Sequence, residues 1–544
     1  MRYKTHFLFL IIFFFYLTDF VSGQFFTSSN LPIIVINTHG QTIPDEPKII
    51  ASMGIIDHKD RPENKITDPF NEYNGRIGIE IRGSSSQSFP KKGYGFETRK
   101  EDGSNNNVSL MGMPQENDWV LHGPYSDKSL IRNMLCYILA GDIMEYAPRG
   151  RYCELVINGI YQGVYVLMEK IKRDKNRVNI AEIAPTDNTG DRLTGGYIIK
   201  IDKETGSNIG GWTSTFKPIP NQPQITYFQY DYPKASDITP NQKVYIQQFI
   251  QLAEESINAA NYDNPSEGYR KYVDDKSLID FIIMNELSKN VDAYRLSTYL
   301  YKDRDSRGGK LKFGPVWDYN LGFGNINYCT NGNPEGLVIT DFNQVCSQDW
   351  WVIHFWWKKF MEDQQLKSDM KKRWQNLRSN KLSDQRIFFV VDSLTNLIKA
   401  AQVRNFQKWP VLNEYVWPNY VVTGSYQGEI QFLKNWLRDR LLWLDQEFGS
   451  YITVNTEDER SEINAEISPN PVHQTVNIHC PSCSAAARVT VRNITGQVLR
   501  QNYPFTDSGN SDTKIDVSDL APGLYFLDIG NTAVPERAFR FVKI

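Results

Sequence analysis

The sequence predicts a multidomain α+β protein, with a β-rich part first, a helical part second and a small all-β domain at the C-terminus. The chain has 544 residues, which is too long for one hydrophobic core. Short alternating apolar runs are frequent from residue 31 to residue 171, whereas apolar residues recur at helical spacing from about residue 241. The acidic stretch at 451–465 is typical of a linker, and short strands with Gly and Pro turns follow it at 466–544.

The first 23 residues have the pattern of a signal peptide. The basic start MRYKTH is followed by the apolar run FLFLIIFFFYL and by small residues at 21–23, which predict cleavage before Gln24. The run is short for a membrane span, so we expect an exported mature chain without a transmembrane span. The net charge of −3 gives no basic field of the kind that favours nucleic acid or anionic lipid.

Strand and hairpin signals mark the β-rich part. Residues 24–65 contain short β-rich runs broken by Gly and Pro, which we expect to pack on a domain at 66–450. RIGIEIR, which begins at Arg76, alternates apolar and polar residues as a strand does, and Asn158-Gly159 predicts a two-residue hairpin. Between them, Ser126 is a candidate N-cap for a helix whose apolar residues recur at helical spacing.

Apolar stripes predict the helices of the second part, among them long ones at 382–404 and 428–448. The last stripe, EIQFLKNWLRDRLLWLDQEF, is strongly amphipathic, and it favours a helix that faces a core over one that binds a membrane. The pairs Trp350-Trp351 and Trp356-Trp357 are interpreted as core residues in preference to a sugar-stacking surface.

Six cysteines in an exported chain can form disulfides. Cys329 and Cys346 bracket a polar loop, and we expect them to pair with each other. Cys480 and Cys483 form a C-x-x-C without a second such pair, so a local disulfide or two thiols is a better interpretation than a zinc site.

Two acidic residues, Asp292 and Asp318, each end a hydrophobic segment. Asn290 precedes the first by two residues, and Asn320 follows the second by two. Carboxylate and amide oxygens suit divalent cations, which phosphoryl transfer requires together with a positioned hydroxyl nucleophile. Asp and Asn are also ordinary turn residues, so the spacing alone leaves a capped loop as the alternative.

Five blocks in order resemble the CotH-type (spore-coat protein H) family of atypical, secreted protein kinases. The blocks are IEIRGSSSQSFPKKGYGFE at 79–97, NDWVLHGPYSDKSLIRN at 117–133, GIYQGVYVLMEKI at 159–171, GGYIIKIDK at 195–203 and GPVWDYNLGFGN at 314–325. The resemblance implies an atypical kinase-like fold with a β-rich N-lobe and a helical C-lobe across 66–450. It also implies transfer of the γ-phosphate of ATP, with Mg²⁺ or Mn²⁺, to Ser or Thr of a protein substrate at the cell surface.

The resemblance also implies roles for single residues. It assigns Asp318 to the metal and Asp292 to the acceptor hydroxyl or a second metal, with Asn290 and Asn320 as neutral ligands. The candidates for nucleotide binding are Lys91, Lys92, Arg82, Ser84, Ser85, Arg132 and Glu169. Lys91 or Lys92 is the expected cation that clamps the nucleotide, and Glu169 falls on a predicted strand.

Residues 466–544 resemble the C-terminal sorting domain of the type IX secretion system, a small immunoglobulin-like sandwich. The matching features are Pro469-Asn470-Pro471, the turn at Gly496 and the segment from Leu520 to Tyr525. The resemblance implies recognition by that secretion machinery and location at the outer-membrane surface or outside the cell. An ordinary immunoglobulin-like binding module is the alternative.

Several chemistries have no signature in this sequence, which contains no H-E-x-x-H, G-x-S-x-G, Walker A or H-R-D-x-x-x-x-N motif. Two alternatives to a kinase remain. One is a non-catalytic surface protein that uses the fold for adhesion or for glycan or matrix binding. The other is transfer of AMP, in place of phosphate, to the acceptor hydroxyl.

Overall fold

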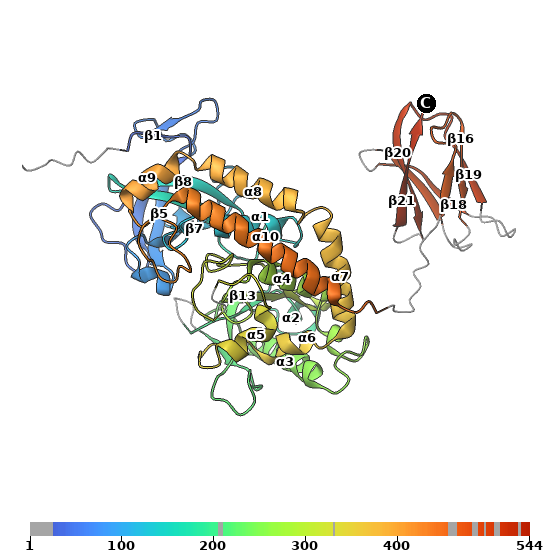
Figure 1. Cartoon of the computed structure of the whole chain (residues 1–544), viewed down its shortest axis with the longest axis horizontal. Coiled ribbons are helices and arrows are strands. Elements are labelled where there is room, and N and C mark those ends of the chain that lie inside the picture. The colour runs from blue at the N-terminus through green and yellow to red at the C-terminus, as the bar shows by residue number, and fades with distance from the viewer. Residues whose placement is uncertain are drawn as a thin grey trace, which may run out of the picture. The chain divides into compact units, whose positions relative to one another are not determined.

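The computed structural model describes residues 26–204, 210–329, 332–454, 465–480, 488–493, 497–504, 512–530 and 535–544 (Figure 1). The chain divides into two compact units, Met1–Thr453 and Val454–Ile544. The signal peptide expected at 1–23 and most of the linker expected at 451–465 lie outside the described residues.

The first unit begins with a closed seven-stranded barrel. In barrel order, its strands are β2 (Ile33–Asn37), β3 (Ile49–Ile56), β5 (Tyr73–Arg82), β6 (Gly93–Arg99), β7 (Asp118–His122), β9 (Ile160–Glu169) and β8 (Gly150–Ile157). Neighbouring strands are antiparallel except at the closure, where β2 and β8 are parallel. Because β2 and β3 are barrel strands, the segment expected at 24–65 is part of this domain and does not form a separate layer. A two-stranded ladder joins β1 (Ser28–Ser29) to β4 (Asn64–Lys65).

Alternation of apolar and polar residues places one apolar face of each strand inside the barrel. Ile36, Ile79, Phe96 and Leu167 belong to the cluster that fills it. The predicted hairpin is confirmed, since β8 ends at Ile157, β9 starts at Ile160, and the two residues between them have positive φ angles of 50° and 77°.

A second, five-stranded antiparallel sheet lies among the helices. Its order is β11 (Gly211–Thr213), β12 (Tyr227–Tyr232), β10 (Tyr197–Ile201), β13 (Thr298–Lys302) and β14 (Leu311–Phe313). The α-helices described are α1 (Arg132–Gly141), α2 (Gly190–Leu193), α3 (Pro240–Asn258), α4 (Asp275–Ser288), α5 (Val338–Val345), α6 (Phe355–Phe360), α7 (Gln364–Arg378), α8 (Asp384–Leu397), α9 (Ala401–Lys408) and α10 (Tyr426–Ser450). Short 3₁₀ turns are η1 (Ser85–Ser88), η2 (Tyr269–Lys271) and η3 (Asp305–Arg307).

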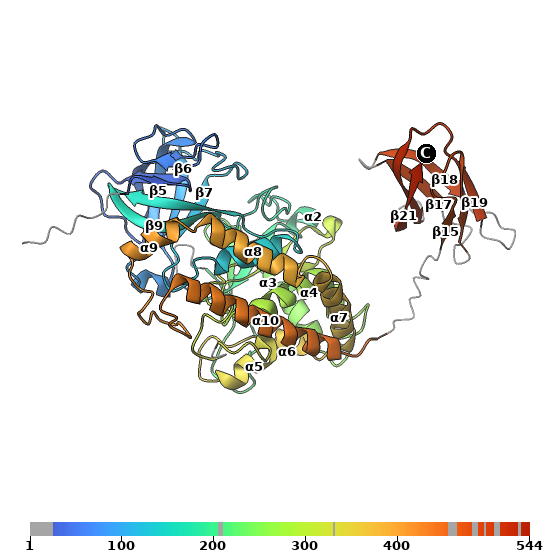
Figure 2. The same ribbon diagram turned by 45° about the horizontal axis from the view of Figure 1, so that its top comes forward.

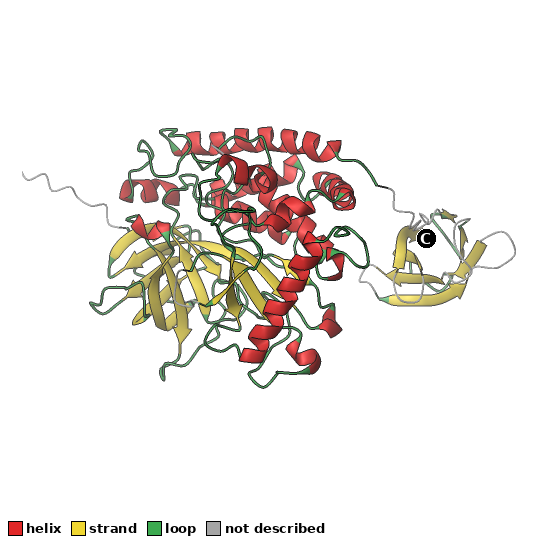
Figure 3. Ribbon diagram, turned by 90° about the horizontal axis from the view of Figure 1, so that it is seen from below, coloured by secondary structure: helices red, strands yellow, loops and turns green. Residues whose placement is uncertain are grey.

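One continuous hydrophobic core joins the helices to the second sheet and to the outer face of the barrel. Helices α8 and α10 lie side by side (Figure 2), and α9 packs against β9 of the barrel. Figure 3 shows the barrel strands together on one side of this unit and most of the helices on the other. The tryptophans Trp356 and Trp357 are fully buried, as the core interpretation predicted, whereas Trp350 is exposed.

The helix expected to start at Ser126 begins later, at Arg132. The Asp127 carboxylate accepts hydrogen bonds from the backbone N–H groups of Ser129 and Arg132. Leu130 has a positive φ angle of 62°. An aspartate-capped turn therefore occupies the first positions of the apolar pattern, because the side chain competes with helical hydrogen bonds there.

A buried ion pair joins three helical segments of the first unit. The side chains of Glu286 on α4 and Arg440 on α10 are both 0% exposed and lie 3.2 Å apart. The Glu286 carboxylate also accepts hydrogen bonds from the backbone N–H groups of Val338 and Ile339 at the start of α5. Arg440 donates to the carbonyl oxygens of Glu286 and Gly336, at 2.8 Å and 2.7 Å.

The second unit is a β-sandwich. One sheet contains β15 (Glu466–Ser468), β16 (Thr475–His479) and β19 (Asp512–Asp516), and the other contains β18 (Val498–Pro504), β17 (Arg488–Asn493), β20 (Gly523–Gly530) and β21 (Pro535–Lys543). Val476 and Ile515 from the first sheet and Val491 and Leu527 from the second share one core.

The cysteines agree with the sequence where they are described. Cys329 and Cys346 form the expected disulfide. Cys480 is disulfide-bonded, and Cys483 lies outside the described residues. Cys136 and Cys153 are free and buried. In the described part of the chain, no helix has the length and apolarity needed to cross a membrane.

Removing one partner of the Glu286–Arg440 pair should strongly destabilise the first unit. Arg440→Met leaves the buried Glu286 carboxylate without its cation, a change that typically costs about 3–5 kcal/mol. Arg438→Met, at an exposed position two residues earlier on α10, is the matched control and should change stability by less than about 0.5 kcal/mol. Chemical denaturation followed by Trp fluorescence measures both variants, and equal losses would contradict a structural role for the pair.

Candidate functional site

A cavity of about 350 Å³ opens between the barrel and the five-stranded sheet. Its lining brings together charged residues of both signs from segments far apart in the sequence. The lining includes the carboxylates of Asp118, Asp202, Asp231, Asp292 and Asp318 and the cations Arg82, Lys170, Lys200 and Lys203. Such convergence of ionisable groups in a concave site is typical of a binding or catalytic centre.

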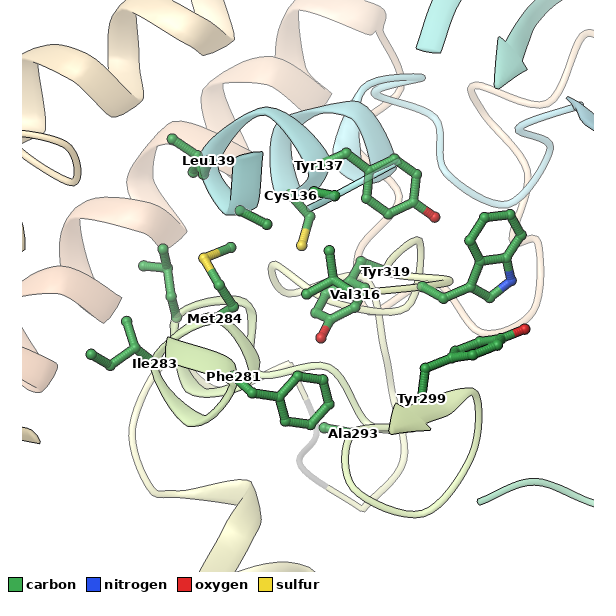
Figure 4. Close-up of a cluster of buried hydrophobic side chains, with 14 of the residues drawn as sticks. Cys136, Tyr137, Leu139, Phe281, Ile283, Met284, Ala293, Tyr299, Val316 and Tyr319 are labelled. Atoms are coloured by element: carbon green, nitrogen blue, oxygen red, sulfur yellow. The ribbon is translucent and has the colours of Figure 1, made fainter. Parts of the chain in front are cut away.

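The turn that carries Asp318 has an unusual backbone. Asp318 has a φ angle of 65°, in the left-handed region, where Asp is among the few tolerated residues other than Gly. Its N–H donates to the Tyr137 hydroxyl at 3.1 Å, and the next N–H, of Tyr319, donates to Asn133 Oδ1 at 2.6 Å. Figure 4 shows Tyr137 of α1 and Tyr319 in the same buried cluster. Side chains of the core therefore hold this turn in place.

The Asp318 carboxylate has no hydrogen-bond or ion-pair partner among the described residues and faces the cavity. The residue is exposed at the cavity surface, but the surrounding cavity walls desolvate its carboxyl group and raise its pKa to about 6, and the nearby Asp292 carboxylate acts in the same direction. Arg82 and Lys203 oppose this shift. At neutral pH Asp318 is an ionised acceptor without a protein partner, which suits it to hold a cation.

Asp292 lies just beyond the C-terminus of α4. Burial raises the pKa of its carboxyl group, and the Arg295 guanidinium, which donates to Oδ1 at 2.7 Å, opposes that shift. Asn290 connects the two aspartate turns, because its Oδ1 accepts the Asp292 N–H at 3.2 Å and its Nδ2 donates to the Asp318 carbonyl at 3.2 Å. The geometry gives Asn290 a bridging role and leaves Asn320 on the cavity wall.

Arg82 and Lys170 are among the cations in the cavity that make no ion pair with any described residue. Arg82, at the end of β5, packs over the Trp317 ring with 5.4 Å between its guanidinium carbon and the ring centre. Lys170 directly follows β9; burial lowers the pKa of its ammonium group, while the carboxylates of Asp118 and Asp231 oppose that shift. Both cations are therefore available for an anionic ligand.

Strand pairing brings further residues that the sequence interpretation did not single out. Lys200 on β10 lies 3.4 Å from Asp202, and β12 supplies Asp231, whose pKa burial raises. The sequence feature that could have identified such residues is a charged residue within an otherwise apolar strand, as in YIIKID at 197–202. His122 also lines the cavity, and burial lowers its pKa to about 4, so its imidazole is neutral at physiological pH.

The predicted phosphate-binding segment is only partly in the cavity. Ser84 and Ser85 line it, and Lys203 Nζ lies 3.4 Å from Ser84 Oγ. Lys91 reaches the wall, but its ammonium donates to the Val164 carbonyl and Asn405 Oδ1, both at 2.7 Å, and to a third oxygen at 3.3 Å. Lys92 donates to the Gln87 carbonyl and does not line the cavity.

Two other candidates form ion pairs outside the cavity lining. Arg132 is 1% exposed and pairs with Asp127 at 2.6 Å. Glu169, on a strand as expected, is buried and pairs with Arg149 at 2.7 Å. The geometry of both favours a structural role over contact with a ligand in this cavity.

The site is not a preformed metal cage. The described residues contain no group of three or more His, Cys, Asp or Glu side chains close enough to hold a metal ion. Mg²⁺ is commonly held by one or two carboxylates, with phosphate oxygens and waters completing the octahedron. The carboxylates of Asp318 and Asp292, without a third, fit that mode of binding.

Comparison with known proteins identifies both units. No curated protein matches the chain. Residues 466–537 match the secretion system C-terminal sorting domain, which indicates export to the cell surface or the surroundings. Residues 79–444, about two thirds of the chain, match the model of the CotH kinase protein family. The chain therefore belongs to the CotH kinase protein family.

Proposed function

We propose that the chain is an exported atypical protein kinase that transfers the γ-phosphate of ATP to a Ser or Thr hydroxyl of a surface or extracellular protein. The observation that carries this proposal is that cations and a carboxylate, each without an ion-pair partner, line one cavity. The unpaired cations Arg82 and Lys170 line the same cavity as the unpaired carboxylate of Asp318, and Arg82 lies near enough to act on that carboxyl group. Phosphoryl transfer needs both, because the triphosphate requires cations and the metal requires carboxylates.

Each group has a proposed task. Asp318 would hold Mg²⁺, which neutralises charge on the transferring phosphoryl group when bound. Asp292 would orient the acceptor hydroxyl and accept its proton as the new oxygen–phosphorus bond forms and the bond from the γ-phosphorus to the bridging oxygen breaks, which releases ADP. Arg82 and Lys170 would contact phosphate oxygens, with Lys203 and Ser84 at the edge of the cavity.

The same parts could act in a kinase-like two-lobed arrangement, in which the barrel supplies Arg82 and Lys170 and the helical part supplies both aspartates. Transfer of AMP would use the same groups with the nucleotide reversed in the cavity. Intact-mass analysis separates the two reactions, since one adds a phosphoryl group to the acceptor and the other adds a nucleotidyl group.

Asp318→Asn should abolish Mg²⁺-dependent binding of ATP and phosphoryl transfer without loss of fold. Asn tolerates the positive φ angle that Ala would not, so the turn is retained. The ionised Asp318 has a pKa raised by folding, so it costs stability above pH 6, and the variant should melt at a higher temperature at pH 8. Isothermal titration with Mg²⁺–ATP and thermal melting test both points; unchanged affinity for ATP would refute the metal assignment.

The affinity for Mn²⁺ should depend on pH through the same carboxyl group. Because the pKa of Asp318 is about 6, a proton competes with the metal below that pH, and affinity should fall about tenfold for each further pH unit. Above pH 7 it should be constant. Electron paramagnetic resonance titration between pH 4.5 and 8 measures the profile, and a flat profile would contradict it.

Lys170→Met should raise the dissociation constant of ATP about 10- to 100-fold, because a charged hydrogen bond contributes about 1.5–3 kcal/mol. Lys175→Met, at an exposed position outside the cavity lining, is the matched control and should leave ATP binding unchanged. Lys91→Met should lower thermal stability without a comparable change in ATP affinity, since its ammonium serves the core. The reverse ranking of Lys91 and Lys170 would restore Lys91 as the phosphate ligand.

A further inference from the structure

The Arg295 side chain connects Asp292 to the segment that follows the disulfide. Arg295 is 4% exposed, and its guanidinium makes four hydrogen bonds. Nη2 donates to Asp292 Oδ1 at 2.7 Å, whereas Nη1 donates to Asp349 Oδ2 at 3.2 Å and to the Trp351 carbonyl at 2.8 Å. Nε donates to the Val291 carbonyl at 2.9 Å. The orientation of the Asp292 carboxylate is therefore set partly by residues 349–351.

The disulfide fixes the start of that segment. Asp349 donates its backbone N–H to the Cys346 carbonyl at 2.9 Å. Phe342, on α5 within the same disulfide-closed loop, lies under Arg295 with 4.5 Å between the guanidinium carbon and the ring centre. The Cys329–Cys346 bond thus closes the loop that places Phe342 against one face of Arg295. It also anchors the start of the following segment, whose Asp349 carboxylate accepts from the tip of that side chain.

The other end of the disulfide also borders the site. Tyr328 is next to Cys329. Burial raises the pKa of its hydroxyl, and the negative charge of Asp292 acts in the same direction. Its ring stacks on Trp417, a residue of the cavity lining, with 5.9 Å between ring centres. The segment after Cys346 is therefore joined to Asp292 through Arg295, and the residue before Cys329 packs against the cavity lining.

The contact with Arg295 matters for Asp292 because other carboxylates lie near it. Asp349 repels Asp292, and Asp202, which lines the same cavity, does the same. Arg295 and Lys203 are the cations that compensate them. If the segment at 349–351 moves, Arg295 loses two of its acceptors and Asp292 loses a fixed direction.

We infer that Arg295 is a positioning residue for Asp292 and that the Cys329–Cys346 disulfide controls phosphoryl transfer by holding Arg295 in place. This inference rests on the proposed function. Closing the bond converts two thiols into one disulfide; two electrons and two protons pass to the disulfide of a thiol–disulfide exchange protein, which becomes a dithiol. The reduced chain should bind nucleotide through Asp318, Arg82 and Lys170 but transfer phosphate slowly, and export to an oxidising compartment should activate it.

The first test compares kinetics of the full chain with a double variant, Cys329→Ser with Cys346→Ser. We expect kcat to fall about 10-fold or more, while KM for ATP changes by less than about twofold, because the loss affects orientation and not nucleotide binding. Cys480→Ser, which removes a disulfide of the second unit, is the control and should retain the parent kcat. A double variant with the parent kcat would overturn the role of the disulfide.

A second test examines Arg295 itself. Arg295→Met combined with Asp349→Asn removes one charge of each sign, so that Asp349 is not left as a partly buried charge without its partner. We expect the acid limb of the pH profile of kcat to move to higher pH, because Asp292 loses the cation that favours its ionised form. A purely structural role would lower kcat without moving that limb, and such a result would overturn the positioning assignment.

A third measurement does not depend on catalysis. The backbone N–H of Leu296 donates to the Asp292 carbonyl at 3.0 Å, so this turn should be protected from hydrogen exchange. We expect the double Cys→Ser variant to lose protection at 291–296, and unchanged protection would overturn the structural half of the inference. If the oxidised parent shows this protection but neither binds ATP nor transfers phosphate, the proposed function fails, whereas the structural link from the disulfide through Arg295 to Asp292 is retained.

Discussion

The architecture around the site depends on the buried pair of Glu286 and Arg440. Taking both charges out of water is expensive, and it is compensated only because each charged group meets several partners in good geometry. Those partners belong to α4, α5, α10 and the segment that leads into α5. Since α4 ends just before Asn290 and Asp292, the pair fixes the base of one aspartate turn. The same pair fixes the start of α5, which lies inside the disulfide-closed loop.

The candidate site departs from the rules that the rest of the fold obeys. Elsewhere in the first unit, buried charges such as Arg132 and Glu169 are paired. In the cavity, Asp318 has a positive φ angle, a raised pKa and no partner, and Lys170 is half-buried without an ion pair. Local costs of this kind persist where a ligand supplies the missing partner, and here the missing partners are a cation and an anion. A metal–triphosphate contains both.

The sequence is informative wherever one local rule decides the structure. The turn at Asn158-Gly159 and the pairing of Cys329 with Cys346 are examples, because turn chemistry and loop closure need no knowledge of distant residues. Barrel closure is not predictable in this way, since the parallel pairing of β2 with β8 joins residues more than a hundred positions apart. The choice among lysines for the phosphate ligand is also not predictable from the sequence, for the same reason. Lys91 follows a Ser-rich turn as a phosphate ligand would, but only the fold reveals that Asn405 and Val164 occupy its ammonium. Lys170, at the end of an apolar strand, carries no local mark of its exposure to the cavity.

Export adds a constraint that links the two units of the chain. The sorting domain indicates that the protein leaves the cell, and the Cys329–Cys346 bond is of the kind that persists in an oxidising compartment. A surface protein that used this fold only for adhesion would gain nothing from keeping Asp318 ionised, unpartnered and in a left-handed turn, because each of these features costs stability. Under the proposed function both carboxylates would meet a metal-bound ligand, and the unpaired cations in the same cavity would meet its phosphate oxygens.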